Sequence, residues 1–209
     1  MIFNLHSLID KYKIKIDNII HIGGHVGTEI DLYKSINNEC AVQIFEPTPE
    51  TYKQLLEVAS NHDNIYAHNV ALGDAECIME LHIDCASKMS NSLLKPKIHI
   101  IQYPHIKFEE VINVPVKTLD SYNLDSSYNF LNIDVQGFED RVLRGGINTL
   151  KNIHYIIIEV NNQELYETGA LYNDLNAFLV AQGFECKELD WAGDTWGDAF
   201  YLRVENTTA

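Results

Sequence analysis

The chain has 209 residues, 46% of them hydrophobic and 22% charged, so it can bury one sizeable core, and we expect a single domain over 1–209. Its formal charge of −15 argues against a nucleic-acid partner, because a surface that follows phosphates needs clustered Lys and Arg. No apolar run approaches the roughly 20 residues that span a membrane. The four cysteines lack metal-binding spacing, which is typical of reduced thiols in a cytoplasmic protein.

Strand-like and helix-like segments alternate along most of the chain. In chain order, the pattern predicts an N-terminal helical segment (1–15, with the helix at 2–12), a strand at 18–22, a helix at 27–36, a strand at 41–45, a helix at 49–60, strands at 64–70 and 128–134, a helix at 138–144, a strand at 153–160, a helix at 171–182, and strands at 184–189 and 198–204. This alternation predicts an α/β fold with a mostly parallel sheet flanked by helices.

The segment at 75–118 interrupts the alternation. Two alternating apolar runs, 77–83 and 111–116, predict an added antiparallel pair, and a polar loop separates them. A long loop inside a compact domain is usually functional or disordered. We expect a lid over the carboxyl ends of the strands, with a passive surface loop as the alternative.

The most informative stretch is 19–27, where an apolar run ends in Gly23, Gly24 and Gly27 before a helical pattern. Residues without a side chain allow a tight strand-to-helix turn and close approach of a ligand to the backbone. Glu46 ends the second apolar run, where an acid can accept both hydroxyls of a ribose. Together they predict a site for an adenosine-containing cofactor.

Three carboxylates are candidates for catalysis: Asp134, Glu139 and Glu159. Adjacent parallel strands lie about 4.8 Å apart, so Asp134 and Glu159 could meet at one site. Neighbouring carboxylates raise each other's pKa, which suits a general base, or they bind a divalent cation, so metal dependence stays open. Asp134 could instead bind the cofactor or cap the next helix. Glu139 could merely complement a helix dipole or pair with a nearby arginine.

Six segments, in this order and spacing, resemble the FkbM-type methyltransferases, which use S-adenosylmethionine. They are Ile-His-Ile-Gly-Gly-His-Val-Gly (20–27), Phe-Glu-Pro-Thr-Pro (45–49), Asn-Val-Ala-Leu-Gly-Asp (69–74), Val-Lys-Thr-Leu-Asp-Ser (116–121), Asn-Ile-Asp-Val-Gln-Gly-Phe-Glu-Asp-Arg-Val-Leu-Arg-Gly (132–145) and Ile-Ile-Ile-Glu-Val (156–160). The resemblance implies the class I methyltransferase Rossmann-like fold, with a mostly parallel seven-stranded sheet. It also implies methyl transfer to a hydroxyl of a sugar or glycan, for example of a deoxyhexose such as rhamnose or fucose.

The resemblance also implies roles for matching positions. The cofactor would lie against residues at or just after the ends of the first four strands of the main sheet. They are His21, Gly23, Gly24, His25, Gly27, Glu46, Pro47, Ala71, Leu72 and Asp134. Asp134 and Glu159 would face the transferred methyl group. Two positions depart from the family pattern, because His21 stands where the family has an acid and His25 where it has Asn. The acid commonly meets the amino end of the cofactor.

Side chains outside these segments are candidates for the acceptor site: Ser90, Ser92, His105, Trp191 and Trp196. The tryptophans, in an expected loop at 190–198, could stack on a sugar or pack on the core. His25 and His105 are alternative bases. The chain could be one domain of a larger glycan-building protein. Alternative functions are a macrolide-type O-methyltransferase, an NAD-linked sugar oxidoreductase, which the absence of a suitable Tyr-x-x-x-Lys disfavours, and a degenerate cofactor-binding domain.

Overall fold

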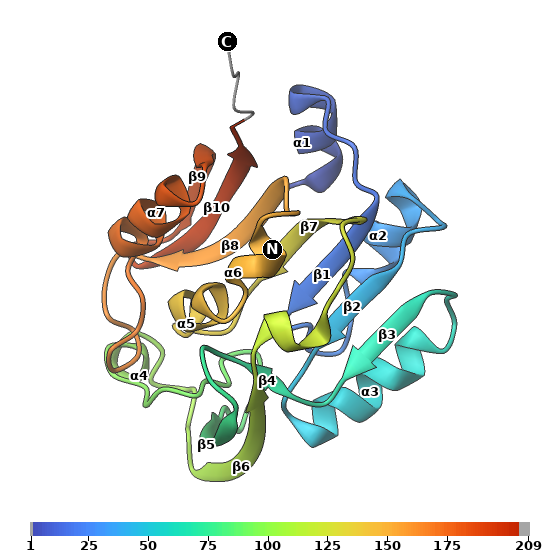
Figure 1. The fold of residues 1–209 in the computed structure, drawn as a ribbon. Helices are drawn as coiled ribbons and strands as arrows, with labels where there is room; N and C mark the ends of the chain where they lie inside the picture. Colours follow the sequence, from blue (N-terminus) through green and yellow to red (C-terminus); the bar gives the residue numbers. More distant parts are fainter. Residues whose placement is uncertain (1, 205–209) are drawn as a thin grey trace.

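The computed structural model describes residues 2–204. The elements in chain order are α1 (Leu5–Tyr12), β1 (Asn18–Ile22), α2 (Ile30–Ile36), β2 (Val42–Phe45), α3 (Pro49–Ala59), β3 (Ile65–His68), β4 (Ala71–Leu72), β5 (Cys77–Ile83), α4 (His99–Gln102), β6 (Glu110–Lys117), the 3-10 helix η1 (Leu119–Tyr122), β7 (Tyr128–Ile133), α5 (Glu139–Arg144), α6 (Ile147–Leu150), β8 (Tyr155–Asn161), α7 (Tyr172–Ala181), β9 (Phe184–Ala192) and β10 (Trp196–Arg203). Figure 1 shows them around one central sheet.

The central sheet has seven strands in the order β3-β2-β1-β7-β8-β10-β9. The first five are parallel, whereas β10 runs antiparallel to both of its neighbours. The expected mostly parallel seven-stranded sheet is therefore confirmed. The order reverses between β1 and β7, and ligands of open α/β sheets bind at such a reversal, outside the carboxyl ends of the strands.

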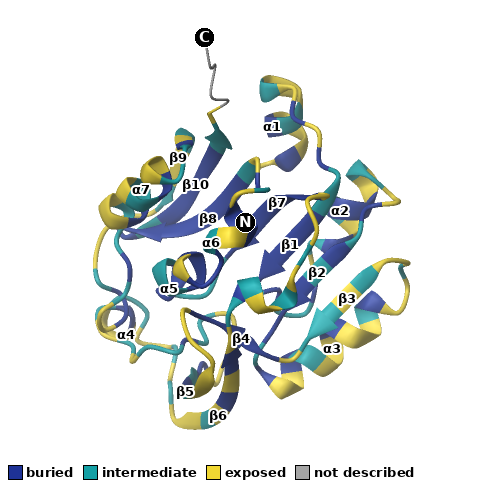
Figure 2. Cartoon of the chain, in the orientation of Figure 1, coloured by how far each residue is buried: buried dark blue, intermediate teal, exposed yellow. Residues whose placement is uncertain are grey.

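Both faces of the sheet are covered, as the continuous apolar strands predict. Alternate residues of each strand point to opposite faces. Even-numbered β1 residues such as Ile20 pack with α5, α6 and α7, whereas Ile19 packs with α1, α2 and α3 on the other face. Figure 2 shows the central strands as buried and the outward faces of α3 and α7 as partly exposed.

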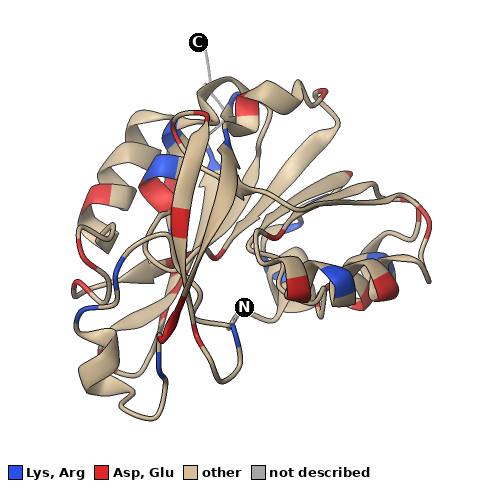
Figure 3. Cartoon of the chain, turned by 90° about the horizontal axis from the view of Figure 1, so that it is seen from below, with Lys and Arg blue, Asp and Glu red and all other residues tan. Residues whose placement is uncertain are grey.

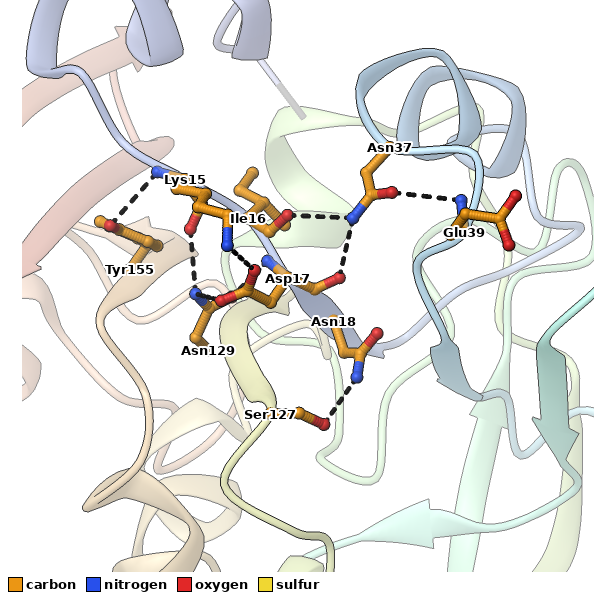
Figure 4. A network of polar contacts seen from close by, with 9 residues as sticks. All are labelled: Lys15, Ile16, Asp17, Asn18, Asn37, Glu39, Ser127, Asn129 and Tyr155. Carbon is orange, nitrogen blue, oxygen red and sulfur yellow. Dashed lines mark hydrogen bonds and ion pairs between the residues drawn. The ribbon is translucent and has the colours of Figure 1, made fainter.

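Side-chain hydrogen bonds fix the amino ends of the central strands, opposite the reversal point (Figure 4). Asn129 of β7 donates to the Lys15 carbonyl (2.9 Å) and accepts from the Asp17 N–H (3.0 Å). Asn37, after α2, donates to the Asp17 carbonyl (3.2 Å). These hydrogen bonds connect the segment before β1 to β7 and to the residue after α2. They help to fix β1 relative to β7, and with it the relative position of their carboxyl ends.

The segment after β3 forms a second sheet in the order β4-β6-β5. Strands β5 and β6 are antiparallel over their whole length, as expected for 75–118. The strand predicted at 64–70 is confirmed over Ile65–His68 but ends two residues earlier than expected, because the chain leaves the main sheet after His68 and Ala71–Leu72 pairs in parallel with β6. The short helix α4, within the polar stretch, was not predicted.

Some predicted boundaries move for local reasons. The N-terminal helix begins at Leu5 rather than residue 2, because Asn4 caps it by accepting from the Ser7 N–H (3.1 Å). The second helix begins at Ile30 rather than residue 27, because Gly27 has a φ of 82°, outside the helical region. The loop expected at 190–198 is wrong, since β9 and β10 extend through Trp191 and Trp196 and leave a tight turn around Gly193.

Candidate active site

A cavity of about 260 Å³ lies at the carboxyl ends of β1, β2 and β7. One part of its lining is apolar and another is polar, and Lys88, Met89, Asn91 and Leu93 also belong to the lining. The apolar lining includes Phe45, Val70, Ala71, Leu72, Leu81, Ile133 and Phe138, and the polar lining includes His21, Glu29, Asn132, Asp134, Gln136 and Asp198. This arrangement suits a ligand with a flat apolar group at one end and charged groups at the other.

The glycine turn after β1 lets the chain pass close under this cavity. Gly23 has a φ of 84°, and a Cβ there would lie 1.7 Å from the Asp134 carbonyl oxygen, so no other residue fits. The N–H groups of Gly23 and Gly24 both donate to the Phe45 carbonyl, which joins β1 to β2 at this edge. Gly23 and His25 line the cavity, whereas Gly24 and Gly27 pack against Ile44 and Leu55 beneath it.

Glu46 connects the turn to the next loop. It is buried, and its carboxylate accepts from the His25 N–H (3.1 Å) and the Thr48 N–H (2.8 Å). Burial raises the pKa of this carboxyl above its ordinary value, although the two backbone hydrogen bonds act in the opposite direction. One N–H on each oxygen leaves each with a further lone pair. Glu46 and Pro47 both line the cavity, so Glu46 can accept from two neighbouring hydroxyls.

Asp134, which follows β7 and lines the cavity, meets Glu159 of β8, which lies outside the lining. The Gln136 amide nitrogen donates to Asp134 Oδ1 (2.7 Å) and to Glu159 Oε2 (3.0 Å), so one side chain holds both carboxyl groups. Gln136 has a φ of 56°, in the left-handed region that glycine favours. Its amide oxygen accepts from the Tyr166 hydroxyl (2.8 Å), which fixes its orientation. The sequence analysis did not identify Gln136 or Tyr166 as site residues.

Glu159 is buried and Asp134 is half-buried, and both lie among like charges. Glu159 is 6% exposed, and burial, followed by repulsion from Asp134 and Glu139, raises its pKa well above its usual range. Glu159 therefore tends to keep its proton, which limits the negative charge at the pair. Glu139 lies fully buried outside the cavity lining, where its Oε1 accepts from the Val135 and Gly137 N–H groups. Burial raises its pKa to about 7.

The pair does not form a metal centre with other side chains. Within residues 2–204, no group of three or more His, Cys, Asp or Glu residues is arranged to hold a metal ion. The Gln136 amide occupies carboxyl oxygens of both Asp134 and Glu159 that a cation would need. The open question of a divalent metal at Asp134 and Glu159 thus gains no support from these residues.

The segment 84–109, here called the lid segment, spans the cavity from β5 to β6. The Asn91 amide donates to Thr48 Oγ1 (2.8 Å), and Lys88 pairs with Glu50 (3.1 Å). The His25 ring donates to the Ser87 carbonyl (3.1 Å). These contacts connect the lid segment to the loops after β1 and β2, and Lys88, Met89 and Asn91 line the cavity.

The residues expected at the acceptor site are not in the cavity lining. Ser92 is buried and donates to the Gln136 carbonyl (2.7 Å), while Ser90 contacts His99. Trp196 donates to the Tyr103 hydroxyl (3.0 Å) of the lid segment. His105 is exposed near Tyr103, and Trp191 lies edge-on to Tyr172 of α7. These side chains are not brought to one site.

Three cavity residues had only weak signals in the sequence: Glu29, Asn91 and Asp198. Asp198 precedes the apolar run Ala199-Phe200-Tyr201, and an acid beside a buried strand is rarely without a partner or a role. Glu29 and Asn91 carried no distinguishing pattern. Asp198 is opposite Glu159 across β10 and β8, a pairing that needs the sheet order.

Comparisons with known proteins agree with this geometry. The family model described as the methyltransferase FkbM domain matches residues 21–186. The 2-O-methyltransferase NoeI of Sinorhizobium fredii (strain NBRC 101917 / NGR234) is 29% identical over 178 residues, which cover 78% of this chain and 73% of that protein.

Solved structures share the fold at low sequence identity. The magnesium protoporphyrin IX methyltransferase of Synechocystis PCC 6803, with bound S-adenosylmethionine, has a TM-score of 0.54 and 9% identity over 96% of this chain and 76% of its own. A S-adenosylmethionine-dependent methyltransferase of Aquifex aeolicus has a TM-score of 0.53 and 10% identity over 97% of this chain and 90% of its own. At such identities the match shows the shared fold.

Proposed function

Because the chain belongs to the FkbM methyltransferase family and is a S-adenosylmethionine-dependent methyltransferase, we propose that it methylates a hydroxyl of a sugar or glycan. The carrying observation is the Asp134–Glu159 pair, held by Gln136 beside the cavity. A carboxylate in this place can take the proton of a hydroxyl. The name of the relative, a 2-O-methyltransferase, supports an oxygen acceptor.

The cavity fits S-adenosylmethionine in a defined direction. Glu46, with a free lone pair on each oxygen, would take the ribose hydroxyls. The apolar residues Ala71, Leu72 and Phe138 would enclose the adenine. The methionine portion would then extend toward Asp134. When bound, the cofactor supplies an electrophilic methyl group on its sulfonium.

The protein's residues would then orient the acceptor and remove its proton. In-line transfer requires the hydroxyl oxygen about 3–3.5 Å from the methyl carbon. Because Glu159 tends to keep its proton, Asp134 is the carboxylate that would accept the hydroxyl proton. Gln136 would hold Asp134 in place during this step, and the lid segment would exclude water from above.

The sugar class rests on the family resemblance and on charge. A net charge of −15 disfavours polyanionic acceptors, and Figure 3 shows Lys and Arg as scattered segments without a continuous basic stripe. A neutral sugar is not repelled by this negative charge, and its binding requires no basic groove. The chain would therefore act on a neutral glycan. It could do so alone or as one domain of a larger glycan-building protein. No helix in the described part of the chain is long and apolar enough to cross a membrane.

The test is methyl transfer to defined acceptors. Purified protein and S-adenosylmethionine are incubated with oligosaccharides ending in fucose or rhamnose and, separately, with a macrolide. The masses of the products are measured by mass spectrometry. We expect one added methyl group on an oligosaccharide. Asp134→Asn should lower kcat by about 10²–10⁴-fold, because it removes the base.

Two controls make the result specific. Asp31→Asn makes the same chemical change at a side chain that is 86% exposed on α2, and it should keep full activity. The Asp134→Asn variant should bind S-adenosylhomocysteine with an affinity within a few-fold of that of the unsubstituted protein, as measured separately. Methylation of the macrolide alone would replace the sugar class, and cofactor binding without transfer to any acceptor would indicate a degenerate domain.

A further inference from the structure

Three carboxylates at the polar end of the cavity have no basic partner in the described part of the chain. They are Glu29, before α2, Asp134, after β7, and Asp198 of β10. Among residues 2–204, Glu29 accepts a side-chain hydrogen bond from Thr28 Oγ1 (2.9 Å), and Asp198 accepts one from the Ile2 N–H. Asp198 is 5% exposed. Carboxylates withdrawn from water are costly unless a cation or hydrogen-bond donors compensate, so this end of the cavity suits a cationic group.

His21 cannot supply the negative charge that the family places at its position. It is 3% exposed, and burial lowers its pKa, which favours the neutral ring, although Glu29 and Asp134 act in the opposite direction. The Tyr33 hydroxyl accepts from the Asn132 amide (3.0 Å), so it is placed to donate to His21 Nδ1 (3.4 Å).

The Tyr33 contact determines which ring nitrogen carries the proton. When Nδ1 accepts, the neutral ring carries its proton on Nε2. Nε2 has no hydrogen-bond partner among residues 2–204, and His21 lines the cavity. The ring therefore offers a donor, which suits a carboxylate and not an ammonium group.

Asp198 and Glu29 line the same cavity from different elements. His21 pairs with Asn132 of β7, and Asp198 is opposite Glu159 of β8. Side chains alternate between faces, so all four point to the face that α2 covers, where Glu29 lies just before that helix. Strands β7 and β8 separate β10 from β1, so Asp198 reaches the cavity from the β10 side and Glu29 from the β1 side.

We propose that Glu29 and Asp198 together bind the α-ammonium group of the methionine portion of S-adenosylmethionine, in place of the acid that β1 lacks. Asp134 is held by Gln136 and stays beside the reacting methyl group. The His21 Nε2–H then serves the carboxylate of the same methionine portion. This inference rests on the cofactor and its direction in the cavity, and it does not depend on the acceptor.

The test compares two ligands that differ at this end only. S-adenosylhomocysteine carries the ammonium group, whereas 5′-methylthioadenosine keeps the adenosine and sulfur but has no amino-acid portion. Calorimetry on the full chain should show that Glu29→Gln and Asp198→Asn each weaken S-adenosylhomocysteine binding by about 10-fold or more, with 5′-methylthioadenosine unchanged. Both amides keep a carbonyl oxygen for the existing Thr28 and Ile2 contacts.

Two further variants serve as control and rescue. Asp31→Asn removes the same charge two residues after Glu29 and should leave both affinities unchanged. His21→Asp combined with Glu29→Gln restores an acid at the end of β1 but removes the Nε2–H donor, so it should regain only part of the lost affinity. If the double variant does not fold, as judged by thermal unfolding, the single variants with the two ligands still decide.

The proposal is overturned if either single variant binds S-adenosylhomocysteine with the affinity of the unsubstituted protein. It is also overturned if the affinity for 5′-methylthioadenosine falls by the same factor as that for S-adenosylhomocysteine. Equal weakening would mean that the substitution disturbs the whole cavity. Failure to methylate any sugar would leave this comparison intact, because it requires no acceptor. Absence of S-adenosylhomocysteine binding to the unsubstituted protein would contradict the cofactor site itself.

Discussion

At the scale of single residues, Glu139 has two carboxyl oxygens in unequal surroundings. Oε1 accepts two backbone N–H groups, while Oε2 is buried without a partner among the described residues. Burial raises the pKa to about 7 from 4.5. Such a group is best accommodated in its protonated form. Its buried position favours a role in holding the turn at 135–137, on which Gln136 depends, over contact with a substrate.

Glu139→Gln should therefore change the pH dependence of stability. The folded-state pKa lies above the unfolded one, so the unfolding free energy of the unsubstituted protein falls as pH rises from about 4.5 to about 7. The neutral amide removes this loss. Urea unfolding should give similar stability for both proteins at about pH 5 and up to about 3 kcal/mol more for the variant at about pH 8. A difference independent of pH would contradict this.

At the scale of elements, the lid segment is fixed more by side chains than by regular structure. Asn91 accepts from the Asp84 N–H (2.7 Å) and donates to Thr48, so it connects the base of the lid segment to the loop after β2. Asp84 is fully buried, and bonds from Ser87 Oγ and the Ala86 N–H lower its pKa. The segment is thus held at its start and across the cavity.

Asn91→Ala should loosen this segment while leaving the core folded. It removes two hydrogen bonds, each worth about 1 kcal/mol, so we expect several-fold faster proteolysis within 85–109. S-adenosylhomocysteine should slow the cleavage again. The matched control is Asn61→Ala, which removes one hydrogen bond from the side-chain amide to the Glu57 carbonyl on the outside of α3. Equal cleavage of both variants would show that Asn91 does not hold the lid segment.

Sequence patterns predicted the main sheet because each strand carries its own signal. The runs at 18–22 and 153–160 are apolar on both faces and match β1 and β8 within two residues. They could not predict β4, since two residues have no period and their pairing with β6 depends on a segment almost 40 residues later. Trp191 and Trp196 were expected in a loop at 190–198, whereas β9 and β10 extend through them to a tight turn.

The candidate site was predictable where function depends on one local motif. The glycine turn, Glu46 and Asp134 each follow a strand, so chain order alone places them at one edge. Glu29, Gln136 and Asp198 were missed because their roles depend on neighbours from other strands. Gln136 became meaningful only once Asp134, Glu159 and Tyr166 were seen around it.

At the scale of the whole molecule, two helical layers enclose the parallel strands, and the smaller sheet β4-β6-β5 lies at the end of the sheet that carries the cavity (Figure 1). The hydrogen bonds at the amino ends of the strands leave the carboxyl ends free for binding. The resulting division gives one rigid end and one binding end. The proposed direction of the cofactor, with the adenosine at Glu46 and the methionine portion at Asp134, would link the roles inferred above.

The most direct measurement is a crystal structure of the protein with S-adenosylhomocysteine. We expect ribose hydroxyls within hydrogen-bond distance of Glu46, adenine between Leu72 and Phe138, and sulfur facing Asp134. A cofactor bound in the opposite direction, or outside this cavity, would contradict the proposed cofactor site.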